Sequence, residues 1–254
     1  MASIVDAFNE ALSEDLSYVK IIAFSIPVNY VFNLYMIGKT SQFELFGTIV
    51  AILLLGLLSK GINNVRMSRR EILTLNPLEY VKALGKTLLV LVPQILVFGT
   101  IGKNLIEKIQ IPIDLPHVPM IFAIIVWSII FSIILTSYMS FAKYLKVAQG
   151  YNFKVILESC IDVLISFLFF IPQLLLANVV LIGPVAYLFS FFNLPFTHFW
   201  FITYCSMVFI VNISILANYL AQSAYENIRG NNEEYDDNVN VNLIDDVSER
   251  VNGN

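Results

Sequence analysis

The sequence has little charge, little cysteine and little histidine. Charged residues fill 13% of its 254 positions, whereas 57% belong to the apolar set AVILMFWYC. Soluble domains carry about 25% charged residues, which they need to cover an apolar core. The composition therefore excludes a water-soluble globular domain, a disordered chain and a nucleic-acid-binding module. The mean hydropathy of +0.75 indicates a polytopic membrane protein instead.

The few residues that commonly carry chemistry are isolated. Cys160 and Cys205 belong to no CxxC pair, and His117 and His198 stand apart from each other and from any cysteine. No P-loop, GxGxxG, HExxH or GxSxG motif is present. The sequence thus predicts no catalytic residue, no metal site, no cofactor and no disulfide framework.

Long charge-free stretches define the fold class. They cover residues 21–38, 45–59, 87–102, 115–142 and 163–225. A helix needs about 20 residues to cross the hydrocarbon core of a bilayer, so the last stretch must double back, and FFNLP at 191–195 is the natural corner. The pattern predicts an all-α, polytopic transmembrane helical bundle of six spans, near residues 19–38, 43–60, 84–102, 119–142, 161–183 and 196–221.

The distribution of lysine and arginine predicts the orientation. With both termini on one side, that side holds eleven basic residues and the other side three, Lys39, Lys103 and Lys108. Cytoplasmic loops carry such an excess, so we expect an integral membrane protein with both termini in the cytoplasm. The loop 61–82 is the most basic. Its Arg66, Arg69 and Arg70 serve either to set the topology or to contact a lipid headgroup or a partner.

The chain divides into three parts. Residues 1–18 form an amphipathic lead-in helix whose apolar side chains recur every four positions, and its acidic polar face favours packing under the bundle over binding to anionic lipid. Residues 19–221 form the six-span domain. Residues 222–254 carry 2 Lys/Arg and 8 Asp/Glu without an apolar period, which predicts an acidic, disordered cytoplasmic tail.

An order of features recurs three times along the chain. An aromatic lead-in at Phe8, Tyr80 and Phe153, spaced by 72 and 73 residues, precedes a span that contains a proline and ends in Ile-Gly. This order predicts three parallel two-span repeats, each with an amphipathic lead-in helix. The alternative is chance, because apolar helices built from few residue types resemble one another.

The prolines of the odd-numbered spans mark helix kinks. A proline inside a helix removes one backbone hydrogen bond and leaves a carbonyl free, which must find a partner inside lipid. Polar amides stand close to each kink. They either line a polar pathway or hold neighbouring helices together. The kink residues are Pro27, Pro93 and Pro172, and the amides are Asn29, Asn33, Gln94 and Gln173.

Four short segments carry a family resemblance: residues 7–12 (AFNEAL), 140–144 (SFAKY), 152–157 (NFKVIL) and 219–225 (YLAQSAY). Across about residues 1–228 the chain resembles the DUF4013-like prokaryotic multi-pass membrane proteins of unknown function. The resemblance implies a membrane-integral helical architecture in a prokaryotic cell membrane and supplies no catalytic residue.

No ionisable residue lies deep in any predicted span, which argues against a proton relay and against intramembrane hydrolysis. We therefore expect a non-enzymatic structural or accessory membrane component. The alternative is a small transporter or channel with a polar pathway near the kinked odd-numbered helices. The expected partners are the lipid bilayer and either another protein or a second copy of the chain, without nucleic acid.

Overall fold

The computed structural model describes residues 4–13, 17–67, 72–108 and 118–228. Within these ranges the chain is all-helical, without a strand. Its elements are α1 (Ile4–Ser13), α2 (Ser17–Met36), α3 (Thr40–Arg66), α4 (Pro77–Lys108), α5 (Val118–Tyr144), the 3-10 helix η1 (Val147–Tyr151), α6 (Phe153–Phe191) and α7 (Phe199–Asn227). Helices α2 to α7 are each long and apolar enough to span a bilayer, which confirms the predicted six-span helical class.

Several helices are longer than the sequence predicts. Helix α4 begins at Pro77, where a proline costs no helical hydrogen bond, and the Asn76 side chain accepts from the amide of Leu78 at 3.2 Å. Helix α6 has 39 residues instead of the predicted span of 161–183. At about 1.5 Å per residue it is roughly 58 Å long, almost twice the bilayer core. The polar segments before the apolar runs continue the helices, because nothing in them breaks helical structure.

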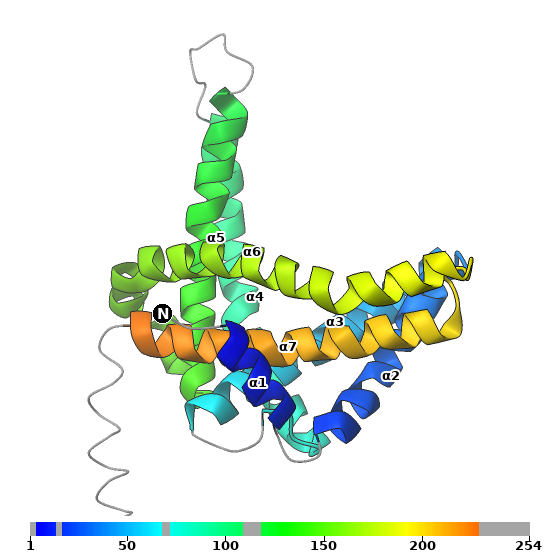
Figure 1. The fold of residues 1–254 in the computed structure, drawn as a ribbon. Helices are drawn as coiled ribbons and strands as arrows, with labels where there is room; N and C mark the ends of the chain where they lie inside the picture. The colour runs from blue at the N-terminus through cyan, green and yellow to red at the C-terminus, as the bar shows by residue number, and fades with distance from the viewer. Residues whose placement is uncertain (1–3, 14–16, 68–71, 109–117, 229–254) are drawn as a thin grey trace, which may run out of the picture.

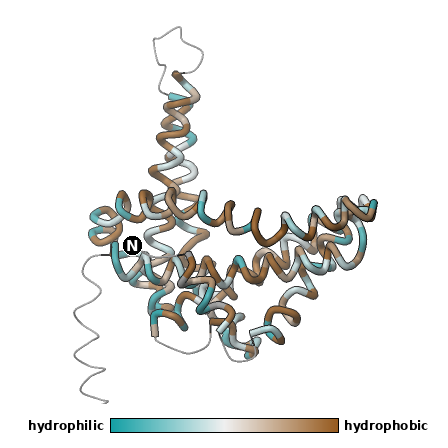
Figure 2. Tube along the Cα trace, in the orientation of Figure 1, coloured by the Kyte–Doolittle hydropathy of each residue, from teal (hydrophilic) through white to brown (hydrophobic). Residues whose placement is uncertain are grey.

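The six long helices form three antiparallel hairpins (Figure 1). Helices α6 and α7 lie side by side, and the α2–α3 turn lies toward the same end of the molecule as the α6–α7 turn. The α4–α5 hairpin rises steeply out of this layer. Apolar residues cover much of the length of all three hairpins in Figure 2.

The ends of the hairpins that hold the predicted cytoplasmic loops pack together. Parts of α1, α3, α4, α5, α6 and α7 meet in one cluster of buried apolar side chains. We call this cluster the hub; it comprises Ala7, Ile62, Ile72, Val90, Tyr138, Met139, Phe141, Ala142, Val163, Phe170, Ile215, Ala217, Tyr219, Leu220, Ala221, Ala224 and Ile228. A second, smaller cluster joins α2 to α3, α4 and α7 through Val28, Leu57, Tyr80 and Ile210.

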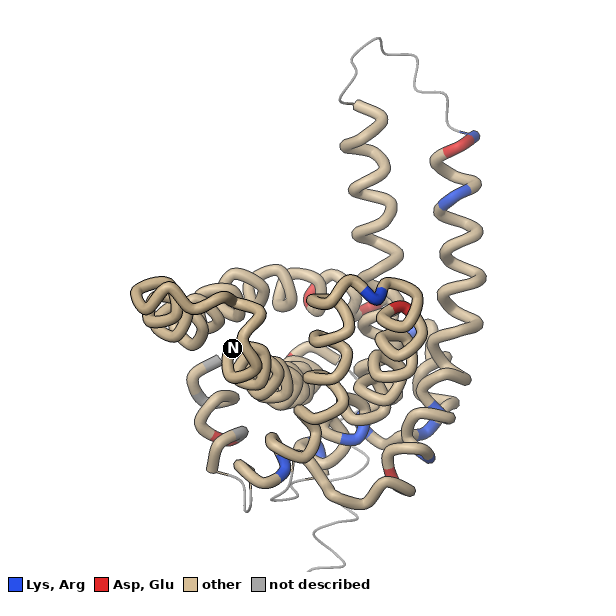
Figure 3. Tube along the Cα trace, turned by 90° about the vertical axis from the view of Figure 1, so that its right-hand side faces the viewer, with Lys and Arg blue, Asp and Glu red and all other residues tan. Residues whose placement is uncertain are grey.

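The far part of the α4–α5 hairpin, residues 95–108 and 118–129, has little packing; we call it the arm. Among its residues only Gly102 and Val126 are buried. Leu96 and Ile121 are 65% and 55% exposed. Charged residues lie at its tip and below it in the body, whereas its shaft carries none (Figure 3).

Two helices bear on the predicted boundaries of the three parts. Helix α1 is described over Ile4–Ser13, and α2 begins at Ser17, inside the predicted lead-in segment 1–18. Helix α7 continues past the predicted end of the domain at 221 to Asn227, because Ser223 is buried and donates to the Ser166 hydroxyl at 3.0 Å. The structure does not describe residues 229–254 of the predicted tail.

The predicted lead-in helices differ among the three units. Helix α1 is separate, and it packs against α7, where Asn218 donates to the Glu10 carboxylate. Tyr80 and Phe153, in contrast, lie in the first turns of α4 and α6 themselves. The second and third lead-ins therefore run into their spans without a break, as parts of α4 and α6. The repeat itself stays a prediction.

Candidate functional site

The two asparagines of α2 face a neighbouring helix. Asn29 donates to the Thr203 hydroxyl of α7 at 2.7 Å, and Asn33 donates to the side-chain and backbone oxygens of Asn29. Both asparagines are half-buried. One amide chain thus connects α2 to α7.

Gln94 of α4 lies in a different place. Its side chain is 3% exposed and donates to the Ser137 hydroxyl of α5 at 2.5 Å and to the Gly150 carbonyl of η1 at 2.8 Å. Ser137 donates to the same carbonyl. A Cβ atom at Gly150 would lie 2.7 Å from Val90 of α4, so glycine is required for η1 to come this close. Gln94, which immediately follows Pro93, therefore connects α4 to both α5 and η1 through hydrogen bonds.

The carbonyl that Pro93 leaves free also has a partner. Because proline has no amide hydrogen, the Leu89 carbonyl four residues earlier loses its helical bond. The Tyr151 hydroxyl, at the end of η1, donates to this carbonyl at 2.7 Å. In α6, which contains Pro172 and also Pro184, the Tyr204 hydroxyl of α7 donates to the Leu181 carbonyl three residues before Pro184 at 2.7 Å. At Pro93, therefore, a tyrosine rather than the neighbouring amide binds the carbonyl that the proline leaves free.

Gln173 of α6 is exposed. It borders an otherwise apolar groove of about 400 Å³ that also includes Val5 and Phe8 of α1, Leu176 of α6 and Ile215 of α7. Deeper in α6, Asn178 exchanges hydrogen bonds with Asn212 of α7 at 2.7 and 3.2 Å.

The structure thus brings Asn29 and Asn33 together and places Gln94 and Gln173 in separate surroundings. The side chains of Pro27, Pro93 and Pro172 are all exposed, each within a continuous helix. The three prolines therefore do not face the interior of the molecule, and the predicted kinks stay a prediction.

Buried hydroxyl groups join the helices of the hub. Ser59 of α3 contacts the Tyr138 hydroxyl of α5 at 2.9 Å and accepts from Thr87 of α4 at 2.8 Å. A second group joins α6 to α7, where Ser166 contacts the Tyr219 hydroxyl at 2.9 Å. The sequence analysis did not single out these residues. The run SIILTSYMS at 132–140, with four small hydroxyl residues in one apolar helix, is the signal that indicates an inward face.

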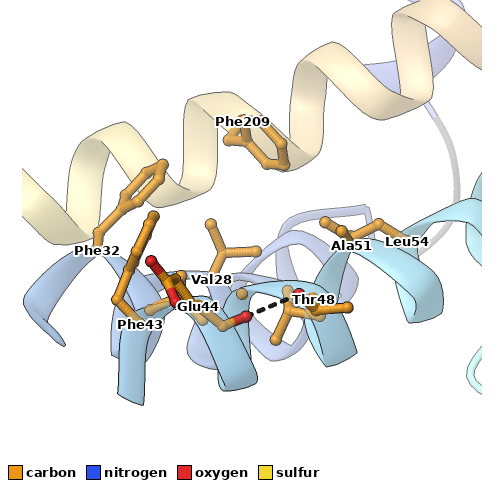
Figure 4. Close-up of a pocket in the computed structure, with 11 residues that line it drawn as sticks. Val28, Phe32, Phe43, Glu44, Thr48, Ala51, Leu54 and Phe209 are labelled. Carbon is orange, nitrogen blue, oxygen red and sulfur yellow. Dashed lines mark hydrogen bonds between the residues drawn. The ribbon is translucent and has the colours of Figure 1, made fainter. Parts of the chain in front are cut away.

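A groove close to Asn29 is lined mainly by apolar side chains. Figure 4 shows Val28 and Phe32 of α2, Phe43 of α3 and Phe209 of α7 around it. Its volume is about 440 Å³, and Glu44, at its edge, is exposed. This groove lacks the convergent polar groups that a site for a polar solute needs.

The isolated sequence candidates stay isolated in the described part of the chain. There, no three His, Cys, Asp or Glu side chains come together to hold a metal. His198 precedes α7, and its Nδ1 accepts from the amide of Trp200 at 3.4 Å. Cys160 and Cys205 are free thiols. His117, Arg69 and Arg70 lie outside the described residues.

Arg66, the described arginine of the basic loop, binds within the chain. Its guanidinium donates to the Ala221 carbonyl at 3.3 Å and lies 5.1 Å from the ring centroid of Tyr225. It therefore attaches the end of α3 to the end of α7.

Comparisons of the chain with protein-family models, with curated proteins and with solved structures find no match. The resemblance to the DUF4013-like proteins stays a prediction.

Proposed function

We propose that the protein is a non-enzymatic structural or accessory component of a prokaryotic cell membrane. One observation carries this proposal: the described amides of the spans mostly bind other parts of the same chain, whereas large apolar side chains remain uncovered. A transport pathway would need such amides free to face a solute. An exposed apolar surface is what lipid and the helices of another membrane protein can cover.

The orientation forms part of the proposal. Lys20, Lys60 and Lys143 lie at the hub ends of α2, α3 and α5, whereas Lys103 and Lys108 lie at the tip of the arm. The excess of lysine on the hub side supports a cytoplasmic hub and cytoplasmic termini.

A photo-crosslinking experiment in the native membrane tests the accessory role. A photoreactive amino acid replaces Leu96 in the arm or Leu176, which is 70% exposed on α6, with Val90 (0% exposed) as the buried control. We expect Leu96 or Leu176 to give a discrete protein adduct, either with another protein or with a second copy, and Val90 to give none. Adducts with lipid alone at both exposed positions would contradict an accessory role.

A flux measurement tests the transporter alternative. Vesicles that contain the protein are exposed to osmotic steps of urea and glycerol and to ion gradients, and are compared with protein-free vesicles. The proposal expects equal rates. A protein-dependent flux that Asn29→Leu abolishes and Gln173→Leu leaves intact, or the reverse, would replace the proposed function by transport.

A further inference from the structure

A further pocket differs from the two apolar grooves because it carries positive charge. It lies between α3, α4 and the end of α5, and its volume is about 260 Å³. Its lining residues are Lys60, Glu79, Lys82, Ala83, Lys86 and Leu145. Since a water molecule takes about 30 Å³ in the liquid, the pocket has room for roughly eight waters, or for an ionic group with part of its hydration shell.

The carboxylate in this pocket is paired with one of its lysines. The ammonium of Lys60 lies 2.7 Å from Glu79, and the Lys60 side chain is only 8% exposed. This pair cancels its own charge. The remaining charge of the pocket comes from Lys82 and Lys86.

Lys82 and Lys86 lie on one face of α4, because residues four apart in a helix are neighbours. Both are exposed, and neither makes an ion pair with any residue that the structure describes. Two like charges at this spacing repel each other. An anion between the two ammonium groups therefore relieves this repulsion and is also attracted by both. Lysine ammonium groups bind phosphate as point charges.

The pocket lies at the start of the apolar run of α4. Lys86 immediately precedes the charge-free run 87–102 of α4. Leu78, Val81 and Leu89 of the same helix are exposed, at 66%, 58% and 62%. A phosphate held by the lysines would therefore have apolar helix surface beside it, against which acyl chains can lie.

We propose that this pocket binds a phosphate-bearing anion through Lys82 and Lys86. The phosphate belongs either to an anionic lipid headgroup or to free inorganic phosphate. This site goes beyond the proposed function and does not depend on it, because a transporter or a scaffold could carry it equally well.

A titration of the purified full-length protein in detergent tests the site. The probes are phosphatidylglycerol, phosphatidylcholine with the same acyl chains, and sodium phosphate, and binding is measured as a rise in the thermal unfolding midpoint. We expect a saturable rise with phosphatidylglycerol and none with phosphatidylcholine. If sodium phosphate gives the same rise and competes with the lipid, the ligand is free phosphate; if only the lipid acts, it is the headgroup.

Variants locate the binding. The double variant Lys82→Gln/Lys86→Gln should raise the half-saturating concentration about thirtyfold, given the usual contribution of about 1 kcal/mol from each lysine near an anionic surface. Lys82→Arg/Lys86→Arg keeps the charge and should keep the binding. The matched control, Lys103→Gln/Lys108→Gln at the tip of the arm, should leave it unchanged.

Two results would overturn the proposal. One is the absence of any rise with either phosphatidylglycerol or phosphate. The other is an equal loss in the two glutamine double variants, which would mean that net charge rather than this pocket attracts the anion. The single variants Lys82→Gln and Lys86→Gln carry the same prediction with a smaller effect, so the test stands if the double variant does not fold.

Discussion

Helices α4 and α5 each run through the hub and then out along the arm, so the same two helices can be compared in two surroundings. In the hub, Thr87 and Gln94 are buried and bind α3, α5 and η1. In the arm, Leu96 and Ile121 are exposed, and Thr100 bonds only to the Leu96 carbonyl of its own helix. Both parts are apolar enough for a membrane. The difference teaches that small hydroxyl residues and amides, more than hydropathy, mark where these helices contact one another.

Glycines show where helices approach closely. A Cβ atom at Gly56 of α3 would lie 3.0 Å from both Leu84 Cβ and the Tyr80 carbonyl oxygen of α4. In the arm, a Cβ atom at Gly99 would meet nothing within 4 Å, whereas one at Gly102 would clash with the Ile130 side chain of α5. Close helix approach therefore occurs in the packed part of the molecule and, within the arm, at Gly102.

The largest expected effect comes from removing a large side chain. Phe141 is fully buried in the hub, and Phe141→Ala should lower the free energy of unfolding by about 3–5 kcal/mol. Leu96→Ala in the arm should change it little, because it leaves no cavity. Reversible unfolding in mixed detergent micelles measures both. Equal losses would mean that the arm is packed as tightly as the hub.

The next effect concerns the two glutamines. Gln94→Leu removes the donor to Ser137 and to the Gly150 carbonyl, and should cost about 1–2 kcal/mol of stability, as interhelical hydrogen bonds in membranes do. Gln173→Leu, on the exposed face of α6, should cost nothing measurable. The same unfolding measurement compares them, and a larger loss for Gln173→Leu would reverse our assignment of the two residues.

The smallest effect concerns the kink in α4. Tyr151→Phe removes the hydroxyl that donates to the Leu89 carbonyl and should cost about 1 kcal/mol. Hydrogen exchange of the α4 amides near Pro93 should rise with it, because η1 no longer covers the kink. Tyr187→Phe, at an exposed position on α6, is the matched control. Unchanged exchange in Tyr151→Phe would show that the kink needs no repair.

Charge-free runs and the positions of Asn193 and Pro195 were enough to predict six helices and their order. Their ends were less predictable: α6 starts at Phe153 because nothing between its polar first turns and its apolar run breaks the helix. The direction of the hairpins was not predictable either. Each span is apolar on all sides, so hydrophobic periodicity does not indicate which face of a helix meets a neighbouring helix.

The hydrogen-bond partners of the amides depend on tertiary structure and could not be predicted from the sequence. The sequence showed that Gln94 stands beside Pro93, but its partner Gly150 is 56 residues away along the chain. Likewise, Tyr151 reaches the Leu89 carbonyl only because η1 folds back against α4. A local pattern identifies a free carbonyl, whereas the group that binds it comes from a distant segment.

The difference between hub and arm is tested most directly by measuring whether lipid or water surrounds the arm in a bilayer. Spin labels are attached at Leu96→Cys, Ile121→Cys and Lys82→Cys in a background without Cys160 and Cys205, and the full chain is reconstituted into vesicles. Collisions with oxygen report lipid, and collisions with a water-soluble nickel complex report water. The account predicts that Leu96 and Ile121 collide with oxygen and are shielded from nickel, whereas Lys82 collides with nickel. Nickel collisions at Leu96 and Ile121 as frequent as at Lys82 would place the arm in water and contradict it.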